Sequence, residues 1–210
     1  MLLWLNGKLI DTIKEVVMKN LFIISAPSAT GKNSVFNAIK EILPEAQRII
    51  TCTTRKPREG EVNGKDYYFL TQIQFEFKKL HDYFIEYNTY TNIRYGTLRS
   101  EIEKHQDGLE PVFLIIDTHG KMNVVEQYPK ATSIFIKPPS FEELEKRIRG
   151  RGQNSEKEIA LRLEQAEREL SKANTYDYIV FNREIKQCAQ DIVKIVEKVM
   201  SEGVRDDGNC

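Results

Sequence analysis

Short apolar runs alternate along the chain with segments in which apolar residues recur every three or four positions. The runs predict five strands, at residues 21–24, 48–52, 111–117, 132–137 and 178–181. The last three are continuous apolar runs, which is typical of strands that are buried on both faces of a sheet. Because helical segments separate the strands, the pattern predicts an α/β fold with a mostly parallel sheet flanked by helices.

Helix signals follow the first strand and recur toward the C-terminus. After the first strand, apolar residues line one helical face at Val35, Phe36, Ala38, Ile39 and Ile42. Capping boxes at residues 140–143 and 155–158 each place Ser three residues before Glu, which predicts a helix start at both sites. A closing helix is predicted from residue 185 to about residue 199, followed by a flexible tail over residues 201–210.

Residues 1–17 are predicted to form an extension ahead of the main domain. Their apolar positions fit one face of an amphipathic helix over residues 8–19, at Leu9, Ile10, Ile13, Val16 and Val17. This helix would dock on the domain, contact a partner or a second copy of the chain, or be dispensable, and the sequence leaves these alternatives open. Polar residues 6–8 end the short apolar start, which argues against a secretory signal.

Residues 54–100 depart from the alternating pattern. They are rich in tyrosine, basic residues and turn formers such as Asn63-Gly64, which predicts short strands and loops in a small lobe inserted after the second strand. Ligand sites often lie where a second lobe meets the core. We therefore expect the second substrate of the protein to bind at this lobe.

Composition narrows the function classes. The 210 residues suffice for one sizeable core with smaller inserted lobes. Lys plus Arg and Asp plus Glu number 31 each, which argues against a protein that coats nucleic acid or an anionic membrane. Cys52, Cys188 and Cys210 lack metal-site spacing, so we expect reduced thiols in a cytoplasmic protein. No apolar run approaches the roughly 18 residues that a membrane span requires.

A loop of small residues joins the first strand to the first helix, which is the setting that a phosphate-binding loop needs. Residues 25–34 read SAPSATGKNS, a partial match to G-x-x-x-x-G-K-[ST]. Backbone N–H groups at a helix N-terminus bind anions because the helix dipole favours negative charge there. Lys32 would add a mobile cation, and the Ser34 hydroxyl could hold Mg²⁺. The alternative for this stretch alone is an ordinary strand-to-helix turn with a stray lysine.

Two arginines flank a proline in the inserted lobe. Arg55 and Arg58 are held close together by Pro57, which stiffens the turn between them. Two guanidinium groups at this spacing suit a dianionic phosphate, because each can donate paired hydrogen bonds. The phenol of Tyr67 could join them. The alternative for the motif by itself is a pair of surface arginines in a loop.

These residues carry a family resemblance. Residues 53–69, TTRKPREGEVNGKDYYF, resemble the nucleoside monophosphate-binding region of guanylate kinases, as does nearly everything from residue 18 to about residue 200. Further matches in the same order are Phe84-Ile85-Glu86, Tyr95-Gly96-Thr97, residues 136–140 and Arg147-x-x-x-Arg151. The resemblance implies a P-loop kinase that moves the γ-phosphoryl of ATP to GMP or dGMP with Mg²⁺. It also implies a GMP-binding lobe at about residues 51–100 and a mobile lid at about residues 140–165.

On the acceptor side, the resemblance implies a role for each matching residue. Glu86 would accept hydrogen bonds from the guanine N1–H and 2-amino group, which adenine does not present in that arrangement. The hydroxyls of Thr51 and Thr97 would complete the recognition of the base. Asp117, an acid at a strand end of the kind that often supports Mg²⁺, is assigned to the GMP site as well. The GMP phosphate would be held by Arg55, Arg58, Tyr67 and Tyr95.

On the donor side, the resemblance implies that the small-residue loop surrounds the ATP phosphates. Phosphoryl transfer needs in-line placement and positive charge rather than covalent chemistry, so no general base is expected. Asn182 would lie near the adenine. The catalytic cations would be Lys32, Arg147, Arg151 and Arg162. The loop residues assigned to ATP are Ala26, Pro27, Ser28, Ala29, Thr30, Gly31, Lys32, Asn33 and Ser34.

The chain departs from the family pattern at several positions. Ala26 and Ala29 stand where glycines are usual, and Asn33 leaves Ser34 as the hydroxyl for Mg²⁺. Ile115 replaces the first acid of an acid-x-Asp motif, and His119 stands where glutamine is typical. One lost carboxylate could cost a few kcal/mol of transition-state stabilisation, or roughly two powers of ten in rate, so we expect an active but slower enzyme.

Two alternatives to this function stay open at the sequence level. The cleft could serve a non-enzymatic module that binds a partner, or a kinase of the same architecture that acts on another phosphorylated small molecule. We expect small nucleotides as partners and neither nucleic acid nor membrane, because the basic residues converge on sites for small anions. Both a monomer and a homodimer are compatible with the sequence.

Overall fold

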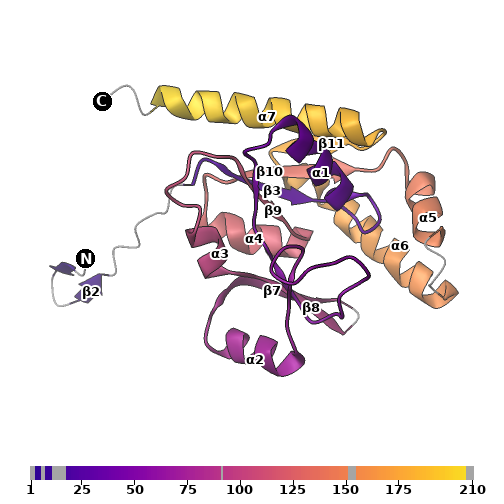
Figure 1. Ribbon diagram of the computed structural model, residues 1–210, viewed down its shortest axis with the longest axis horizontal. Helices are drawn as coiled ribbons and strands as arrows, with labels where there is room; N and C mark the ends of the chain where they lie inside the picture. Colours follow the sequence, from indigo (N-terminus) through magenta and orange to yellow (C-terminus); the bar gives the residue numbers. More distant parts are fainter. Residues whose placement is uncertain (1–2, 6–7, 11–17, 91, 151–154, 207–210) are drawn as a thin grey trace.

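A five-stranded parallel sheet forms the centre of the protein. The computed structural model describes residues 3–5, 8–10, 18–90, 92–150 and 155–206 (Figure 1). Neighbouring strands pair in parallel in the order β11-β10-β3-β9-β4, which confirms the predicted parallel α/β sheet. In that order the strands are β11 (Tyr178–Phe181), β10 (Thr132–Lys137), β3 (Leu21–Ser25), β9 (Val112–Ile115) and β4 (Gln47–Arg48).

Helices cover both faces of this sheet because successive side chains of each strand point to opposite sides. On one face, α1 (Lys32–Ile42) and α7 (Ile185–Asp206) pack against a core that includes Phe22 and Ile24 of β3 (Figure 1). On the other face, Leu21 and Ile23 join a second core that includes α4 (Thr118–Gln127) and α3 (Arg99–Glu103). The central strand β3 is therefore buried along its whole length.

The last strand departs from its predicted environment. Ile179 and Phe181 of β11 are 37% and 49% exposed, so the prediction of burial on both faces is wrong for this strand. The reason is its position, because β11 lies at the edge of the sheet and, among the described strands, pairs only with β10. The other two continuous runs, in β9 and β10, are buried as predicted apart from the last residue of each.

The strand predicted at residues 48–52 is two short strands that belong to different sheets. Its first part is β4 of the parallel sheet, whereas β5 (Cys52–Thr53) starts the inserted lobe. Ile49 packs into the core beneath the parallel sheet, and Cys52 packs into the core of the lobe. The apolar run is continuous in sequence because its first part packs into one hydrophobic core and its last part into another. Sequence periodicity alone does not show where one strand ends and the next begins.

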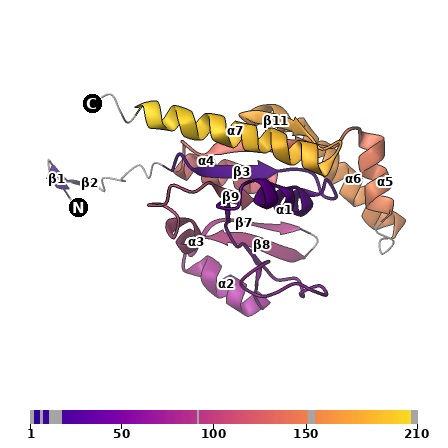
Figure 2. The same ribbon diagram turned by 45° about the horizontal axis from the view of Figure 1, so that its top comes forward.

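The inserted lobe has its own four-stranded sheet, in the order β6-β5-β8-β7. The other elements of the lobe are β6 (Tyr68–Phe69), α2 (Gln72–Leu80), β7 (Phe84–Tyr90) and β8 (Ile93–Leu98). The rings of Phe75 and Phe84 stack at 4.5 Å between centroids beside the buried thiol of Cys52. In both views the lobe lies on the opposite side of the parallel sheet from α7 (Figure 2).

Two helices form the predicted lid region, α5 (Phe141–Arg149) and α6 (Glu156–Ser171), and a short 3₁₀ helix, η1 (Ala173–Thr175), leads from them to β11. Ser155 and Glu158 cap α6 reciprocally, as predicted, and Ser140 caps α5 by accepting a hydrogen bond from the Glu143 N–H. The two helices share a small apolar cluster of their own. Arg151, predicted to be catalytic, lies outside the described residues.

Both chain ends differ from their predicted form. A helix over residues 8–19 is wrong at its start, because β1 (Leu3–Leu5) and β2 (Lys8–Ile10) pair as antiparallel strands. The Asn-Gly dipeptide between them in the sequence is the pair that two-residue hairpin connections favour, and residues 11–17 lie outside the described part. The tail predicted from residue 201 is wrong as far as Asp206, since α7 runs that far and adding a turn to an existing helix costs little.

The remaining sequence-level expectations concern thiols and membranes. Cys52 and Cys188 are free and buried, and burial raises the pKa of each thiol to about 12, whereas Cys210 lies outside the described residues. Within the described part of the chain, no helix combines the length and the apolar character that crossing a membrane requires.

Candidate active site

The small-residue loop between β3 and α1 turns tightly through two left-handed residues. Gly31 precedes α1 with a φ of 91°, and Ala29 has a φ of 66°. The Thr30 N–H donates to the Pro27 carbonyl at 3.2 Å, which closes the turn. Glycine adopts such angles freely, but in alanine the left-handed region costs roughly 1–2 kcal/mol. Ala29 therefore holds strain at the position where the family usually carries glycine, whereas Ala26 is outside the left-handed region.

Lys32 lies over this loop. It is the first residue of α1, and its Nζ donates to the carbonyl of Ala26 at 2.6 Å. No acidic residue occurs in the first turn of α1, so the positive end of the helix dipole is not offset there. The loop, the helix end and the ammonium group thus lie together, and that they bind an anion stays a prediction.

Asn182, which follows the edge strand β11, contacts the loop between β3 and α1. Its side chain is buried, and its Nδ2 donates to the Thr30 carbonyl at 2.6 Å. Beside it lies a cavity of about 510 Å³, into which lid residue Arg147 also reaches. The Arg147 Nε is paired with Glu143 at 2.9 Å. The structure thus brings four elements together at the predicted ATP side: the loop, α1, the lid and the end of β11.

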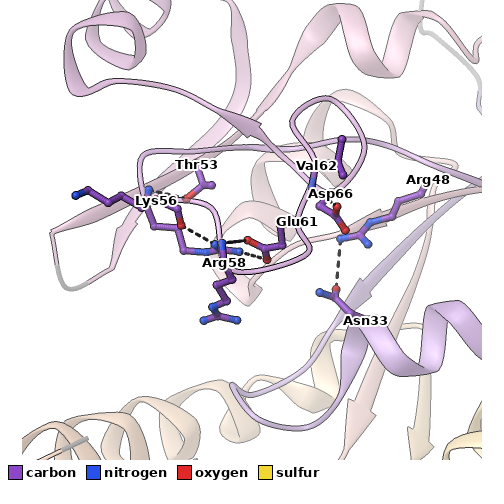
Figure 3. Close-up of polar contacts among 9 residues, drawn as sticks. Asn33, Arg48, Thr53, Lys56, Arg58, Glu61, Val62 and Asp66 are labelled. Carbon is purple, nitrogen blue, oxygen red and sulfur yellow. Dashed lines mark hydrogen bonds and ion pairs between the residues drawn. The ribbon is translucent and has the colours of Figure 1, made fainter. Parts of the chain in front are cut away.

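Three further donor-side residues occupy distinct positions. Ser34 is exposed in the first turn of α1, and Asn33 beside it accepts a hydrogen bond from Arg48 at 3.3 Å (Figure 3). Arg162 projects from α6 toward the inserted lobe. Burial raises the pKa of the Tyr90 hydroxyl at the end of β7, and the Arg162 guanidinium opposes that rise. Arg162 of α6 is therefore near Tyr90 of the lobe, and its catalytic role stays a prediction.

Arg55 is fixed in the lobe by a bidentate ion pair. Its Nη1 and Nη2 each contact the Glu61 carboxylate at 2.6 Å, and Nη1 also donates to the Lys56 carbonyl at 2.9 Å. A guanidinium has five N–H donors. Among the described residues, these contacts leave the Nε–H and one Nη2–H of Arg55 without a partner. These two donors lie on one edge of the fork, the geometry that binds two oxygens of a phosphate.

Aromatic rings lie beside the Arg55 guanidinium, and Arg58 shares its Glu61 partner. The Arg55 guanidinium lies 5.0 Å from the centre of the Tyr67 ring, and Tyr67 is 6.4 Å from Tyr95 on β8. The Arg58 N–H donates to Glu61 at 2.7 Å, and its guanidinium is directed away from that carboxylate (Figure 3). Glu61 thereby holds both arginines of the predicted motif, one by its side chain and one by its backbone.

Glu86 and Thr97, which the resemblance assigns to the base, lie together on one face of the lobe's sheet. Glu86 on β7 is opposite Thr97 on β8, and the Thr97 hydroxyl donates to Glu86 Oε1 at 2.5 Å. Because side chains two residues apart share a face, Tyr95 lies on the same side as Thr97, and Asn88 on the same side as Glu86. The sheet therefore presents the buried Glu86 carboxylate beside Tyr95, whose ring centre is 6.4 Å from that of Tyr67.

Glu86 is 5% exposed, and burial raises the pKa of its carboxyl group to about 7. The hydrogen bond from Thr97 opposes this rise, and the nearby Asp117 carboxylate adds to it. Strongly perturbed carboxyl groups in a cleft are typical of functional sites. A carboxylate that carries a desolvation penalty gains most from a ligand that donates two hydrogen bonds to it.

Asp117 is engaged through both of its carboxylate oxygens. Oδ1 accepts from the N–H groups of His119 and Gly120 and thereby caps α4, while Oδ2 accepts from the Asn88 amide at 2.7 Å. It therefore links the core to the lobe beside Glu86. Thr51 is buried at the entrance to the lobe, and its backbone carbonyl accepts from Tyr68. Their assignment to GMP remains a prediction.

The sequence reading missed three polar residues of the cleft. Glu61 is part of the matched segment, but only contact geometry shows that it holds Arg55. Asn88 follows Glu86 at the alternation of one strand face, which is a signal that could have identified it. Glu169 on α6 is buried, with one oxygen unpaired within the described part of the chain. Burial raises the pKa of Glu169, and the nearby Lys32 ammonium opposes the rise.

Substitution of Glu61 by glutamine should weaken GMP binding about tenfold, because Arg55 would no longer be held at the orientation that presents its free edge. The hydrogen bond to Arg55 lowers the pKa of Glu61 to about 2, so the carboxylate is charged at any working pH and the amide removes that charge. The measurement is the KM for GMP compared with the KM for ATP, which should change little. Glu59→Gln, an exposed neighbour on the same loop, is the matched control. Unchanged or tighter GMP binding would show that Glu61 competes for Arg55 instead.

Known proteins are similar to this chain in fold and in sequence. Residues 18–199 match the family model of guanylate kinase. The chain is 41% identical to a guanylate kinase of Fusobacterium nucleatum, over 84% of this chain and 95% of that protein. It is 43% identical to one from Shewanella violacea, over 84% and 86%. The crystal structure of guanylate kinase from Anaplasma phagocytophilum has a TM-score of 0.70 to it at 30% identity, covering 85% of this chain and 84% of that one. The similarity spans nearly all of the predicted main domain.

Proposed function

The chain belongs to the guanylate kinase family, and we propose that its loop at residues 26–34 and its inserted lobe hold ATP and GMP with their phosphates facing each other. It is an ATP:GMP phosphotransferase, which converts ATP and GMP into ADP and GDP. The assignment of individual residues to each nucleotide is the proposal that follows.

The acceptor site is the observation that carries this proposal. Arg55 with Tyr67 and Tyr95 forms an anion site, and the buried Glu86 with Thr97 lies on the adjoining part of the same sheet. A guanine base offers two adjacent donors, N1–H and the 2-amino group, which a carboxylate can accept together. Adenine offers no such pair, so a buried acceptor would be left without partners in its complex. This arrangement supports GMP and dGMP as acceptors.

In the donor site, positive charge would hold the ATP phosphates, and the cavity beside Asn182 would hold the adenine base. Lys32 and the loop N–H groups would hold the ATP phosphates, and the cavity beside Asn182 would take the adenine end. Arg147 and Arg162 on the two lid helices would contact the γ-phosphoryl group as the lid closes, together with Arg151 outside the described residues. Closure excludes water from the transfer, which would otherwise hydrolyse ATP.

Mg²⁺ fits this site through few protein ligands. Among the described residues, no group of three or more His, Cys, Asp and Glu side chains could hold a metal ion by itself. Mg²⁺ in such enzymes is held largely by substrate phosphates and water, and it neutralises charge on the transferring group. The exposed Ser34 hydroxyl at the start of α1 is the protein oxygen that we assign to it. Ile115, where the family has an acid, packs against the apolar core around α1 and supplies no charge here.

A steady-state assay of ADP formation tests the proposal. With Mg²⁺ and ATP, we expect turnover with GMP and dGMP and only background with AMP and UMP. Tight GMP binding without ADP formation would identify a binding module, and turnover with another monophosphate in place of GMP would identify a different kinase. The first result would contradict the phosphotransferase activity, and the second would contradict the assignment of Glu86, Thr51 and Thr97 to guanine.

A further inference from the structure

The carboxylate of Glu86 is confined on two sides. Thr97 holds Oε1 from the strand side, at 2.5 Å. Oε2 lies against the backbone of α4, at Gly120. A Cβ atom placed on Gly120 would be 2.6 Å from Glu86 Oε2, 2.9 Å from Cδ and 3.3 Å from Cγ. Real Cβ atoms do not approach other atoms as closely as the first two distances, so Glu86 in this position excludes any side chain at residue 120.

The backbone at Gly120 does not itself require glycine. Its φ is negative, unlike those of Gly31, Gly60 and Gly64, and it lies within the first turn of α4. A glycine inside a helix is less favourable than alanine, because it loses more conformational entropy on folding. The remaining physical reason for glycine is the close approach of Glu86.

Neither α4 nor the carboxylate can readily move away. The helix is fixed by the Asp117 cap, by Lys121 Nζ, which donates to the Thr175 carbonyl at 2.7 Å, and by the fully buried Val124. The Glu86 carboxylate is limited on one side by Thr97, and the like charge of Asp117 disfavours an approach on another. The carboxylate is therefore confined by Thr97, Gly120 and Asp117.

We propose that Gly120 is a specificity-determining position, which sets the place of the Glu86 carboxylate so that both of its oxygens face the two guanine donors. A side chain at residue 120 displaces the carboxylate toward the base or breaks its bond to Thr97. The inference rests on the proposed assignment of Glu86 to guanine. It extends the specificity for guanine to a glycine, which has no side chain that could contact the nucleotide.

The test is Gly120→Ala in the full chain, with binding of GMP and of ATP measured separately by calorimetry. We expect the Kd for GMP to rise about tenfold to a hundredfold, with the Kd for ATP within about twofold of its original value. The ratio of kcat/KM for GMP to that for inosine monophosphate, which lacks the 2-amino group, should also fall. Met122→Ala on the same helix, where the side chain is 62% exposed, is the control and should leave all of these values unchanged.

A double-mutant cycle separates this inference from general disturbance of the helix. In a Glu86→Ala background the atoms that the new methyl group meets are absent, so Gly120→Ala should have no further effect on GMP binding. Equal losses in both backgrounds, or a GMP affinity within about twofold of the original for Gly120→Ala alone, would overturn the proposal. Failure of the original chain to form ADP from ATP and GMP would instead contradict the proposed function.

Discussion

Lys32→Ala should reduce kcat by at least about 10²–10³-fold while leaving the affinity for GMP largely intact. The lysine supplies a positive charge where the equatorial oxygens of the transferring phosphoryl group become more negative. Its Nζ donates to the Ala26 carbonyl of the phosphate loop at 2.6 Å, so we expect the substitution to act on the donor side and not on the acceptor site in the lobe. Steady-state kinetics with calorimetry of GMP binding would separate the two effects.

A matched control for this substitution lies on the same helix. Lys40 also donates from Nζ to a backbone carbonyl, that of Ala46 at 2.7 Å, but at the opposite end of α1. Lys40→Ala should therefore leave kcat within about twofold of its original value, since no phosphate is within its reach. A loss of GMP affinity that equals the loss of turnover in Lys32→Ala would contradict the division into donor and acceptor sites.

Glu86→Gln should raise the KM for GMP about 10²-fold or more and change the KM for ATP little, because the amide turns a donor toward one of the guanine donors. Glu101→Gln is the control, since Glu101 is a buried carboxylate of α3 that pairs with Lys104 and accepts a hydrogen bond from Tyr68 of the lobe. Equal losses for GMP and ATP would contradict the role of Glu86 in reading the base.

The same residue predicts a pH dependence. Burial raises the pKa of Glu86 from 4.5 to about 7, so the carboxyl group is charged above pH 7 and mostly protonated below it. The guanine donors require the charged form, and lowering the pH from 8 to 6 should raise the Kd for GMP about tenfold. In Glu86→Gln the part of the pH dependence that is due to residue 86 should be absent. The GMP phosphate titrates near pH 6 and contributes equally to the pH dependence of both proteins.

The raised pKa of Glu86 also makes the stability of the nucleotide-free protein depend on pH. Because the folded-state pKa of Glu86 is raised, the charged form costs stability, and this contribution to the free energy of unfolding falls as the pH rises from 4.5 to about 7. The glutamine variant should lose that slope. Thermal unfolding across this pH range, compared between the two proteins, measures it.

Much of the fold follows from local pattern. The parallel sheet, its flanking helices and the inserted lobe were predicted from apolar runs and from the change of composition after residue 54, because each element carries its own periodicity. The failures occurred where a distant partner decides the outcome. Residues 48–52 contribute to two hydrophobic cores, and β11 is partly exposed because no strand in the described part of the chain pairs with its outer edge.

The site divides in the same way. Arg55, Tyr67, Glu86 and Thr97 could be assigned from the sequence through the family resemblance, and the structure brings them together on one lobe. Glu61 and Gly120 could not, since their importance lies in what they touch. Glu61 is an ordinary loop glutamate until its bidentate contact with Arg55 is known. Gly120 becomes informative only when the distance from a Cβ atom placed on it to the Glu86 carboxylate is known.

The central claim is that the donor and acceptor phosphates face each other across the cleft. The most direct measurement uses a compound in which adenosine and guanosine are joined, 5′ to 5′, through a chain of five phosphates. If the claim is right, this compound competes with both ATP and GMP and binds about 10²-fold tighter than either, because the second contact becomes intramolecular. Competition with only one nucleotide, or an affinity no better than that of GMP or ATP alone, would contradict it.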